Sequence, residues 1–420
     1  MDYVLTKNFN VPEAYRIDVY ERTGGYQSLK RLFTMKPVDV IEEVKSSGLR
    51  GRGGAGFSAG LKWSFIPKDG KKNVYLCVNA DESEPGTFKD RSLLELDPHR
   101  LVEGVIIAAY AIGAKTAYIY IRGEFDLPHT RIKAAVAEAY QKGYLGESIL
   151  QSGFGLNLYV HRGAGAYICG EETGLIESLE GKRGYPRIKP PFPAIQGLFQ
   201  SPTIVNNVET LSVLPYILMV GANAYRAIGT EKSTGTKLFS VSGPVQRPGV
   251  YEVPMGTPLR HFLQEQAGGM LPGKVLKAVI PGGSSMPVLN AQEVEEVNLD
   301  YESMASKGSM LGSGGVIVIP EDYCMVKALA NLGRFYAHES CGQCSPCREG
   351  TGWAAKVLAR LEAGKGEAGD IDLLLDIGRK MTGATICVLA DSLAMPMASF
   401  IKKFRPEFEE HLTLKKCPKG

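Results

Sequence analysis

The sequence predicts a mixed α/β chain built from three units: a parallel sheet with crossover helices, a small mixed β domain and a C-terminal helical bundle. Between residues 73 and 160, apolar strand-like runs alternate with helical patterns, which is typical of a parallel sheet. Residues 237–319 carry a hairpin, a short helix and two further strands, and helical periodicity dominates from Tyr323 onward. A chain of 420 residues is too long for one core and accommodates all three units.

In chain order, we expect four segments. Helices and a glycine-rich loop occupy residues 1–70, and a Rossmann-like parallel-sheet domain occupies residues 71–232. Within it, strands are expected at 73–78, 116–121 and 156–160, with helices at 99–112 and 126–142. A β-grasp (ubiquitin-like) domain is expected at residues 233–320 and a helical bundle at residues 321–420.

Composition excludes several classes of protein. With 44% hydrophobic and 22% charged residues, the chain has the composition of ordinary globular proteins. A net charge of +3 is too small to indicate nucleic acid or an anionic membrane as a partner. No apolar run reaches transmembrane length, and the first residues do not read as a signal or transit peptide. We therefore expect a cytoplasmic location, no nucleic acid and no direct membrane insertion.

The first glycine-rich stretch, residues 51–57 (GRGGAGF), predicts a phosphate cradle. Gly51, Gly53 and Gly56 satisfy the spacing of a dinucleotide fingerprint, but they follow a predicted helix rather than a strand, so that interpretation fails. Exposed backbone N–H groups nevertheless suit a phosphate. Cations and flat rings are interleaved with them: Arg50, Arg52, Phe57, Lys62, Trp63 and Phe65. A flexible surface loop is the alternative.

Polar residues follow two of the predicted strands. Residues 79–87 (NADESEPGT) come after the first strand, where open α/β sheets bind ligands, although a solvated acidic turn remains an alternative. Residues 163–173 (GAGAYICGEET) form a second glycine-rich turn, here in the strand-to-helix context that suits a nucleotide. Residues 181–203 are rich in proline and irregular, and they include Lys189 and Phe192. A helix is expected from about Asn206, with Asn207 beside it at the N-terminus.

Cysteine spacing predicts an iron–sulfur cluster. Cys341, Cys344 and Cys347 lie in the run ESCGQCSPCREG (residues 339–350), and Cys387 stands forty positions further on. Three thiolates in one loop and a fourth from elsewhere suit the corners of a [4Fe–4S] cubane. Structural zinc more often uses two C-x-x-C pairs, and it remains the alternative, as does chance. The other cysteines are expected to be buried or incidental: Cys77, Cys169, Cys324 and Cys417.

Together these motifs resemble the NADH-binding flavoprotein subunit of respiratory complex I, the 51-kDa type. The resemblance rests on residues 51–57, 79–86, 163–173 and 339–350, in that order, and covers essentially the whole chain. It implies an NADH dehydrogenase that holds FMN, NADH and one [4Fe–4S] cluster bound by Cys341, Cys344, Cys347 and Cys387. Because FMN carries the hydride, no catalytic protein residue is expected.

The resemblance also assigns binding residues. For FMN it implies Gly51, Arg52, Gly53, Gly54, Lys62, Asn79, Asp81, Glu82, Ser83, Gly170, Glu171, Glu172, Asn206 and Asn207. For NADH it implies Phe57, Phe65, Glu84, Tyr167, Glu172, Lys189 and Phe192.

The same resemblance implies partners. They are the large iron–sulfur subunit of complex I and a thioredoxin-like [2Fe–2S] protein, through which the chain would lie peripheral to the inner membrane. The alternative is the diaphorase subunit of a soluble NAD-linked hydrogenase or formate dehydrogenase. A zinc-stabilised scaffold that has lost its flavin is a third interpretation, opposed by the intact glycine loops.

Overall fold

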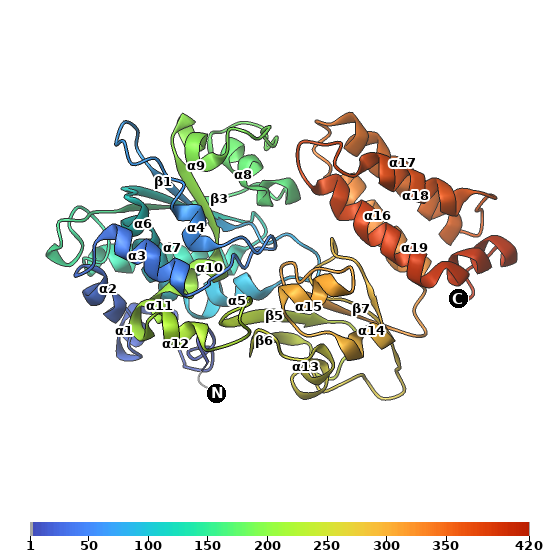
Figure 1. Cartoon of the computed structure of the whole chain (residues 1–420), viewed down its shortest axis with the longest axis horizontal. Helices are drawn as coiled ribbons and strands as arrows, with labels where there is room; N and C mark the ends of the chain where they lie inside the picture. Colours follow the sequence, from blue (N-terminus) through green and yellow to red (C-terminus); the bar gives the residue numbers. More distant parts are fainter. Residues whose placement is uncertain (1–2, 420) are drawn as a thin grey trace.

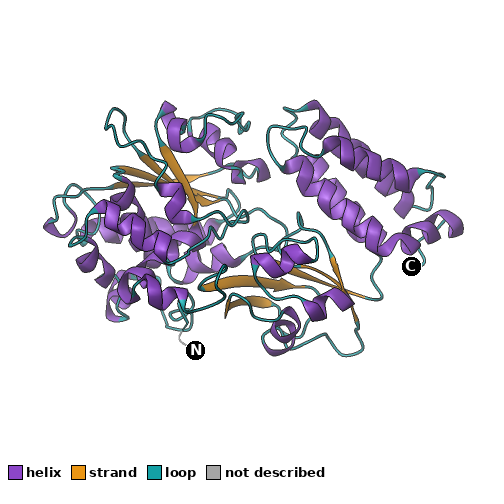
Figure 2. Cartoon of the chain, in the orientation of Figure 1, coloured by secondary structure: helices purple, strands orange, loops and turns teal. Residues whose placement is uncertain are grey.

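The computed structural model describes residues 3–419, which form two β-sheets and a separate group of long C-terminal helices (Figures 1 and 2). The first sheet lies among the N-terminal helices, the second sheet lies in the middle of the chain, and the last four long helices stand beside both (Figure 1).

The first sheet is parallel throughout, with strand order β3-β2-β1-β4. Its strands are β1 (Tyr75–Ala80), β2 (Thr116–Ile121), β3 (Asn157–Arg162) and β4 (Thr203–Asn207). Leu76, Val78 and Ile119 are fully buried, as expected for strands covered on both faces. Strands β2 and β3 extend the sheet on one side of β1, whereas β4 joins the other side. The order therefore reverses between β1 and β4, which is where open α/β sheets bind ligands.

Helices cover this sheet and fill the connections between its strands. They are α1 (Ile17–Arg22), α2 (Gln27–Leu32), α3 (Pro37–Ser46), α4 (Ala59–Trp63), α5 (Lys89–Leu96), α6 (Pro98–Ile112), α7 (Asp126–Gln141), α8 (Glu172–Leu179), α9 (Pro193–Gln196), α10 (Val208–Ser212), α11 (Leu214–Val220) and α12 (Ala222–Arg226). Short 3-10 turns lie at η1 (Ile149–Gln151), η2 (Tyr167–Gly170) and η3 (Leu198–Gln200). Residues 1–70 were expected as a segment of their own, but Val4, Leu29 and Val44 belong to the same hydrophobic core as the sheet.

Strand β4 corrects one prediction. Residues Thr203–Asn207 pair with β1 along their whole length, with Asn79 opposite Asn207, and the following helix begins at Val208 rather than near Asn206. The strand is short, and Pro202 precedes it directly, so the sequence alone predicts that the irregular segment continues. Asn207 still acts as a helix cap, because its side-chain oxygen accepts from the backbone N–H of Glu209 at 2.9 Å.

The second unit is a mixed five-stranded sheet with order β6-β5-β9-β7-β8. Its elements are β5 (Thr236–Ser242), β6 (Gly249–Pro254), α13 (Leu259–Glu265), β7 (Leu276–Ile280), β8 (Leu289–Asn290), α14 (Ala291–Glu296), α15 (Tyr301–Ser306) and β9 (Gly315–Pro320). The hairpin β5–β6 and the parallel pairing of β5 with β9 reproduce the predicted β-grasp arrangement.

The C-terminal unit consists of four helices, α16 (Met325–Glu339), α17 (Ser345–Glu362), α18 (Asp370–Met381) and α19 (Leu389–Leu414). Pro346 lies in the first turn of α17, as its sequence position predicts. Leu329, Leu358 and Leu393 are fully buried between the helices. The same hydrophobic cluster continues to Ile168 and Ile280, so the helices pack against both other units.

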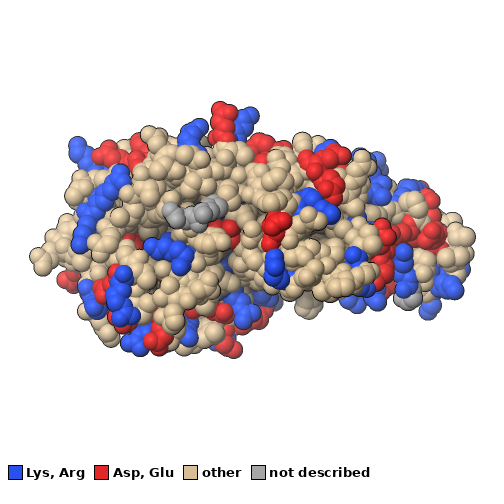
Figure 3. Space-filling model, turned by 90° about the horizontal axis from the view of Figure 1, so that it is seen from below, with Lys and Arg blue, Asp and Glu red and all other residues tan. Residues whose placement is uncertain are grey.

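Charge is dispersed over the surface. Basic and acidic side chains are interspersed on the face that Figure 3 shows, in agreement with the net charge of +3. Among residues 3–419, no helix combines the length and apolar character that a bilayer crossing requires.

Candidate functional site

A cavity of about 590 Å³ lies where the three units meet. Its walls come from the glycine loop and the ends of β1 and β4 in the first unit, from Ser285 and Ser313 in the second, and from Leu389 and Asp391 in the helical unit. The volume falls within the range of roughly 300–1,000 Å³ that is common for small-molecule and cofactor sites. Its place beside β1 and β4 is the reversal point of the sheet.

The glycine loop enters this cavity through Gly53 and Gly54. A side-chain carbon at Gly53 would lie 3.1 Å from the Asn207 Cβ, a tight contact that glycine avoids. The Arg52 side chain turns away from the cavity and is fully buried. Its Nη2 donates to the carbonyl oxygens of Thr234 and Thr236 at 2.8 and 3.0 Å. Arg52 therefore anchors the loop to the second unit.

The polar stretch after β1 forms one wall. The Asp81 backbone N–H donates to Asn79 Oδ1 at 3.1 Å, and Ser83 Oγ donates to Asp81 Oδ2 at 3.1 Å. Burial raises the pKa of Asp81 to about 7, which the Ser83 hydrogen bond partly offsets. The Glu82 carboxylate accepts from two N–H groups in the first turn of α5, at 2.8 and 2.9 Å, so it fixes that helix against the wall.

Lys89 is a wall residue that the sequence interpretation missed. It is the one cation among the described residues that line the cavity, and its Nζ lies 2.8 Å from Asp90 Oδ1 and 2.7 Å from Glu209 Oε2. Burial opposes its charge, but the two carboxylates hold the pKa of Lys89 above its ordinary value. The available signal was its place two residues beyond the polar stretch, at the start of a helix.

Glu84 connects all three units. Its Oε2 accepts from Tyr167 Oη at 2.6 Å, and its Oε1 accepts from the Ser285 backbone N–H at 2.7 Å. Ser284 Oγ donates to Glu84 Oε1 at 3.2 Å and lies 2.7 Å from Tyr336 Oη, which belongs to α16. Burial and the neighbouring Glu84 charge raise the pKa of Tyr167 well above its usual value, so the phenol stays protonated and donates.

The second glycine-rich turn closes the cavity near α8. The Gly170 carbonyl accepts from Asn79 Nδ2 at 2.8 Å, which ties this turn to the end of β1. The Glu171 side chain caps α8, because its Oε2 accepts from the backbone N–H groups of Thr173 and Gly174 at 2.8 and 2.9 Å. Its other oxygen accepts from Lys189 Nζ at 2.8 Å.

Glu172 belongs to an ion-pair group at the edge of the site. Its two carboxylate oxygens lie 2.9 Å from Lys62 Nζ and 2.9 Å from Lys189 Nζ. Burial opposes ionisation, yet the two ammonium groups hold the pKa of Glu172 below its usual value. Lys62 also donates to the Val205 carbonyl at 3.0 Å. These three charged residues do not line the 590 Å³ cavity.

Three aromatic residues are exposed outside the cavity. Phe57, Phe65 and Phe192 have 49%, 48% and 58% of their surface exposed, an unusual state for large apolar rings. The centroids of Phe57 and Phe65 are 6.1 Å apart. Asn206 is buried and accepts from Trp63 Nε1 at 2.8 Å, which holds α4 against β4.

The structure thus divides the predicted binding residues into two groups. Those that line the cavity are Gly53, Gly54, Asn79, Asp81, Glu82, Ser83, Glu84, Tyr167, Gly170, Glu171 and Asn207. Those that do not are Gly51, Arg52, Phe57, Lys62, Phe65, Glu172, Lys189, Phe192 and Asn206.

The four predicted cluster cysteines line one small pocket. Cys341, Cys344, Cys347 and Cys387 share its walls, although the last comes from the segment before α19. Within residues 3–419, no three of their sulfur atoms lie within 4.8 Å of one another. Thiolates around a single zinc would lie about 3.8 Å apart, given Zn–S bonds of about 2.3 Å. The wider spacing fits a cluster of several irons better than zinc.

The cavity and the cysteine pocket share a wall. Ile168, Cys387 and Leu389 line both spaces, so one layer of side chains separates them. The Ile386 backbone N–H points at Cys344 Sγ from 3.4 Å, a contact that suits a charged thiolate. The arrangement can place a large organic ligand directly beside an iron–sulfur cluster.

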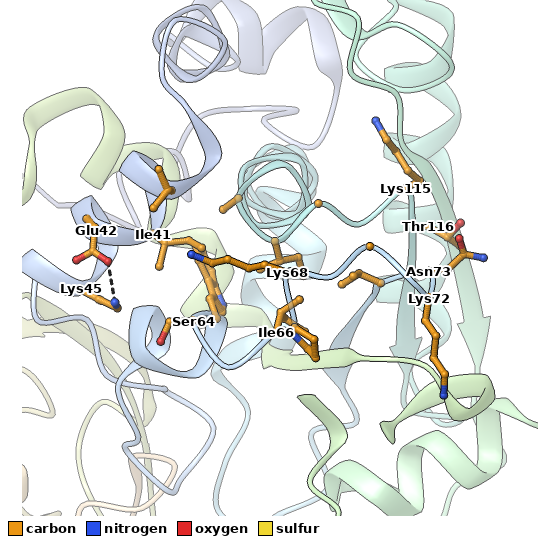
Figure 4. A pocket seen from close by; sticks show the side chains of 18 residues that line it. Ile41, Glu42, Lys45, Ser64, Ile66, Lys68, Lys72, Asn73, Lys115 and Thr116 are labelled. Atoms are coloured by element: carbon orange, nitrogen blue, oxygen red, sulfur yellow. Dashed lines mark hydrogen bonds and ion pairs between the residues drawn. The ribbon is translucent and has the colours of Figure 1, made fainter. Parts of the chain in front are cut away.

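A second cavity, of about 450 Å³, contains none of the predicted site residues (Figure 4). It lies at the N-terminal ends of β1 and β2, opposite the edge where parallel sheets bind ligands. Two of its lysines are engaged separately: Lys45 pairs with Glu42, and Lys72 donates to the Gln200 carbonyl at 2.7 Å. These side chains do not converge on one point.

Three family models match the chain in succession. Residues 44–216 match the Nuo51 FMN-binding domain, residues 237–319 match the SLBB domain, and residues 327–411 match the NADH-ubiquinone oxidoreductase-F iron-sulfur binding region. These ranges follow the three units of the structure.

Relatives that align with the whole chain agree with these family models. An NADH-quinone oxidoreductase F subunit of Rhizobium meliloti (strain 1021), the one numbered 2, is 53% identical over 416 residues, covering 99% of both chains. The corresponding F subunit of Streptomyces coelicolor (strain ATCC BAA-471 / A3(2) / M145) is 51% identical and covers 99% of this chain and 92% of its own. A chain in the crystal structure of air-oxidised NAD⁺-reducing [NiFe]-hydrogenase superposes with a TM-score of 0.84 at 37% identity, covering 98% of this chain and 67% of that one.

Proposed function

The chain belongs to the family of NADH-quinone oxidoreductase F subunits, and from this premise we propose that it takes electrons from NADH and feeds quinone reduction in a respiratory complex. FMN and one [4Fe–4S] cluster are its cofactors. The observation that carries the proposal is the shared wall of Ile168, Cys387 and Leu389. It keeps the two cofactor sites one side-chain layer apart, as rapid electron transfer between them requires.

FMN, when bound, supplies the exchange between the two-electron chemistry of NADH and the one-electron chemistry of the cluster. The protein itself binds FMN and NADH and orients them. Gly53 and Gly54 let the backbone approach the ligand closely, and Lys89, already paired with Asp90 and Glu209, is the one cation that the described cavity wall offers a flavin phosphate. Ile168 and Leu389 keep water from the wall between the sites. Neither a general acid nor a nucleophile is assigned.

We assign the nucleotide end of NADH to the outer residues. Phe57, Phe65 and Phe192 present exposed rings on which flat rings can stack. Glu172 stands nearby in its pair with Lys62, where a carboxylate can accept from ribose hydroxyl groups. Glu84 and Tyr167 lie in the cavity itself and are assigned to the nicotinamide end.

Electrons leave through partner proteins. We propose a thioredoxin-like [2Fe–2S] protein and a large iron–sulfur protein as neighbours, which would also attach the chain to the inner membrane at its cytoplasmic side. The relatives named as F subunits reach 53% identity, whereas the hydrogenase chain reaches 37%, so quinone reduction is favoured over a hydrogenase role. Purification of the native assembly checks this, since recovery of hydrogenase subunits would reverse the choice.

The test of the function uses the full chain, purified without oxygen. We expect flavin absorbance above broad cluster absorbance, bleaching by NADH, and NADH-dependent reduction of ferricyanide. Cys387→Ala is expected to lose most of its iron and the reduced-state EPR signal, because an open iron corner destabilises the cluster. Cys77→Ala, a buried thiol in β1, is the control and keeps both.

Two results would contradict these assignments. If the purified chain shows no flavin absorbance or does not oxidise NADH, the proposed function is wrong. A full iron content in Cys387→Ala would contradict only the assignment of Cys387 as a cluster ligand.

A further inference from the structure

A second group of metal-binding side chains lies at the far end of the helical unit. Cys324 is the N-cap of α16, His411 belongs to the last turns of α19, and Cys417 follows the end of α19. Their two sulfur atoms and one imidazole nitrogen all lie within 4.8 Å of one another. Cys324 and His411 are buried, at 3% and 0% exposure, and Cys417 is partly exposed. We propose that these three residues bind one zinc ion, which fastens the C-terminal segment to the start of α16.

The hydrogen bonds of His411 orient it as a ligand. Its Nδ1 lies 2.7 Å from the Glu407 carbonyl oxygen, which can only accept, so Nδ1 carries the proton. The other nitrogen, Nε2, then presents its lone pair, and it points at Cys324 Sγ from 3.4 Å. A histidine whose second nitrogen donates to a carbonyl is the usual arrangement at protein zinc sites.

The start of α16 holds the Cys324 sulfur in place. The Lys327 backbone N–H donates to its Sγ at 3.4 Å, at the N-terminus of the 15-residue helix α16. Burial raises the pKa of the Cys324 thiol to about 11, and the Lys327 N–H group only partly offsets this, so Cys324 stays a thiol until a metal ion displaces its proton. Glu407 does not compete for the ion, because its carboxylate pairs with Lys277 and accepts from the Met325 N–H at 3.1 Å.

The spacing suits a tetrahedral ion. Bonds of about 2.3 Å to sulfur and about 2.0–2.1 Å to nitrogen place tetrahedral ligand atoms about 3.5–3.8 Å apart. The Cys324–His411 distance of 3.4 Å is close to that value, and the third ligand atom lies within 4.8 Å of both. On the partly exposed side, water completes the fourth position. Two thiols lose their protons to solvent as Zn²⁺ binds, so the buried centre carries no net charge.

This site is separate from the cluster. The cluster cysteines follow the C-terminal end of α16, whereas Cys324 precedes its N-terminal end, and 15 helical residues span roughly 22 Å. The matched iron–sulfur region covers residues 327–411, so Cys324 and Cys417 lie outside it. The zinc ion therefore has a structural role: it closes the bundle at the end remote from the cofactors, where Figure 1 shows the C-terminus beside α19.

The experiment uses the full chain, purified without oxygen in a thiol-free reductant, equilibrated with micromolar Zn²⁺ and freed of unbound metal. We expect about one zinc per chain in addition to the iron of the cluster. X-ray absorption at the zinc edge should show two sulfur ligands at about 2.3 Å together with nitrogen or oxygen ligands at about 2.0–2.1 Å. Cys417→Ser and His411→Gln should each lose most of the zinc while keeping flavin and iron, and Cys77→Ala should keep all three.

Three outcomes would overturn the site. The first is wild-type chain without zinc after this treatment, which leaves only a thiol–imidazole hydrogen bond. The second is a Cys324–Cys417 disulfide found by mass spectrometry of the unreduced chain. The third is zinc that persists in both variants, which would place the ion elsewhere. Retention of iron and flavin in the variants separates loss of this site from misfolding and from failure of the proposed function.

Discussion

Glu172 is the residue whose charge has the clearest functional consequence. Its carboxylate neutralises Lys62 and Lys189, and the Lys62 ammonium has no second carboxylate partner among the described residues. Glu172→Gln would release that positive charge beside the proposed ribose site. A 2′-phosphate, repelled by the native carboxylate, would then be attracted. We expect kcat/KM for NADPH to rise several-fold and the NADH/NADPH ratio to narrow correspondingly.

Steady-state kinetics on flavin-loaded protein measure that ratio. Glu177→Gln is the matched control, since Glu177 lies in the same helix but pairs with Arg187. An unchanged ratio in Glu172→Gln moves the discriminating role to another carboxylate, with Glu84 next.

Because the pKa of Glu172 is lowered, its ion pairs stabilise the fold at all pH values above its ordinary pKa of 4.5 and weaken only below it. The charge of Glu172 should therefore stay constant between about pH 6 and pH 8, and a change in coenzyme preference over that range is expected only from the 2′-phosphate, whose second pKa is about 6.

Arg52 shows what residue types in a motif do not reveal. In the sequence it sits between glycines and reads as a phosphate ligand, but its guanidinium is held by carbonyl groups more than 180 positions away. Lys62 and Glu172 are similarly 110 positions apart and meet only through the fold. A local pattern identifies which segments form the site, whereas tertiary contacts decide which side chains face it.

At the scale of elements, the contact between α6 and α10 controls the shape of the cavity. Gly104 lies against the α10 backbone: a side-chain carbon there would be 2.1 Å from the Leu211 carbonyl oxygen. Gly104→Ala must therefore push α10 away. This movement reaches the cavity, because Asn207 both caps α10 and lines the cavity. We expect destabilisation of about 1–3 kcal/mol, a lower melting temperature and loss of flavin.

Gly352→Ala is the control for that substitution. Gly352 lies in α17 with no neighbouring atom within 4 Å of the added carbon, so alanine should stabilise its helix by about 0.5–1 kcal/mol. Thermal unfolding and flavin absorbance measure both variants. Equal melting temperatures for the two would show that α10 accommodates the methyl group.

Elements with strong apolar periodicity could be predicted, whereas an element that depends on tertiary pairing could not. The strand at residues 116–121 has the expected bounds, and the helix ending at Ile112 begins one residue before the expected start, at Pro98, because the apolar periodicity of both is strong. Strand β4 was missed, although it supplies one side of the cavity, since its five residues lie between Pro202 and a helix. Its strand identity depends on pairing with β1, which no local pattern records.

At the scale of the whole molecule, the hydrogen-bond network of Glu84 holds three units around one cavity. Tyr336→Phe removes the hydroxyl group that bonds to Ser284 while keeping the ring that packs edge-on to Tyr167. Loss of one hydrogen bond is worth about 1 kcal/mol, so the helical unit should detach more often. We expect limited proteolysis near residues 320–324 to accelerate several-fold.

Tyr251→Phe provides the comparison, because the Tyr251 hydroxyl donates to the Arg247 carbonyl at 2.8 Å within one unit. Its cleavage rate should match wild type. If Tyr336→Phe is also cleaved at the wild-type rate, the units are held together by apolar packing alone.

The cavity that the three units enclose determines how early in synthesis the flavin can be bound. Its walls begin at Gly53 and end at Met395, so the last wall is made when almost the entire chain exists. At translation rates of about 5–20 residues per second, the roughly 170 residues between Arg226, where the first unit ends, and the final wall take about 8–34 s. During that interval the first unit can fold with its glycine loop and acidic stretch open to solvent. Stable capture of the flavin must therefore be a late event in the life of a nascent chain, after the helical unit has docked.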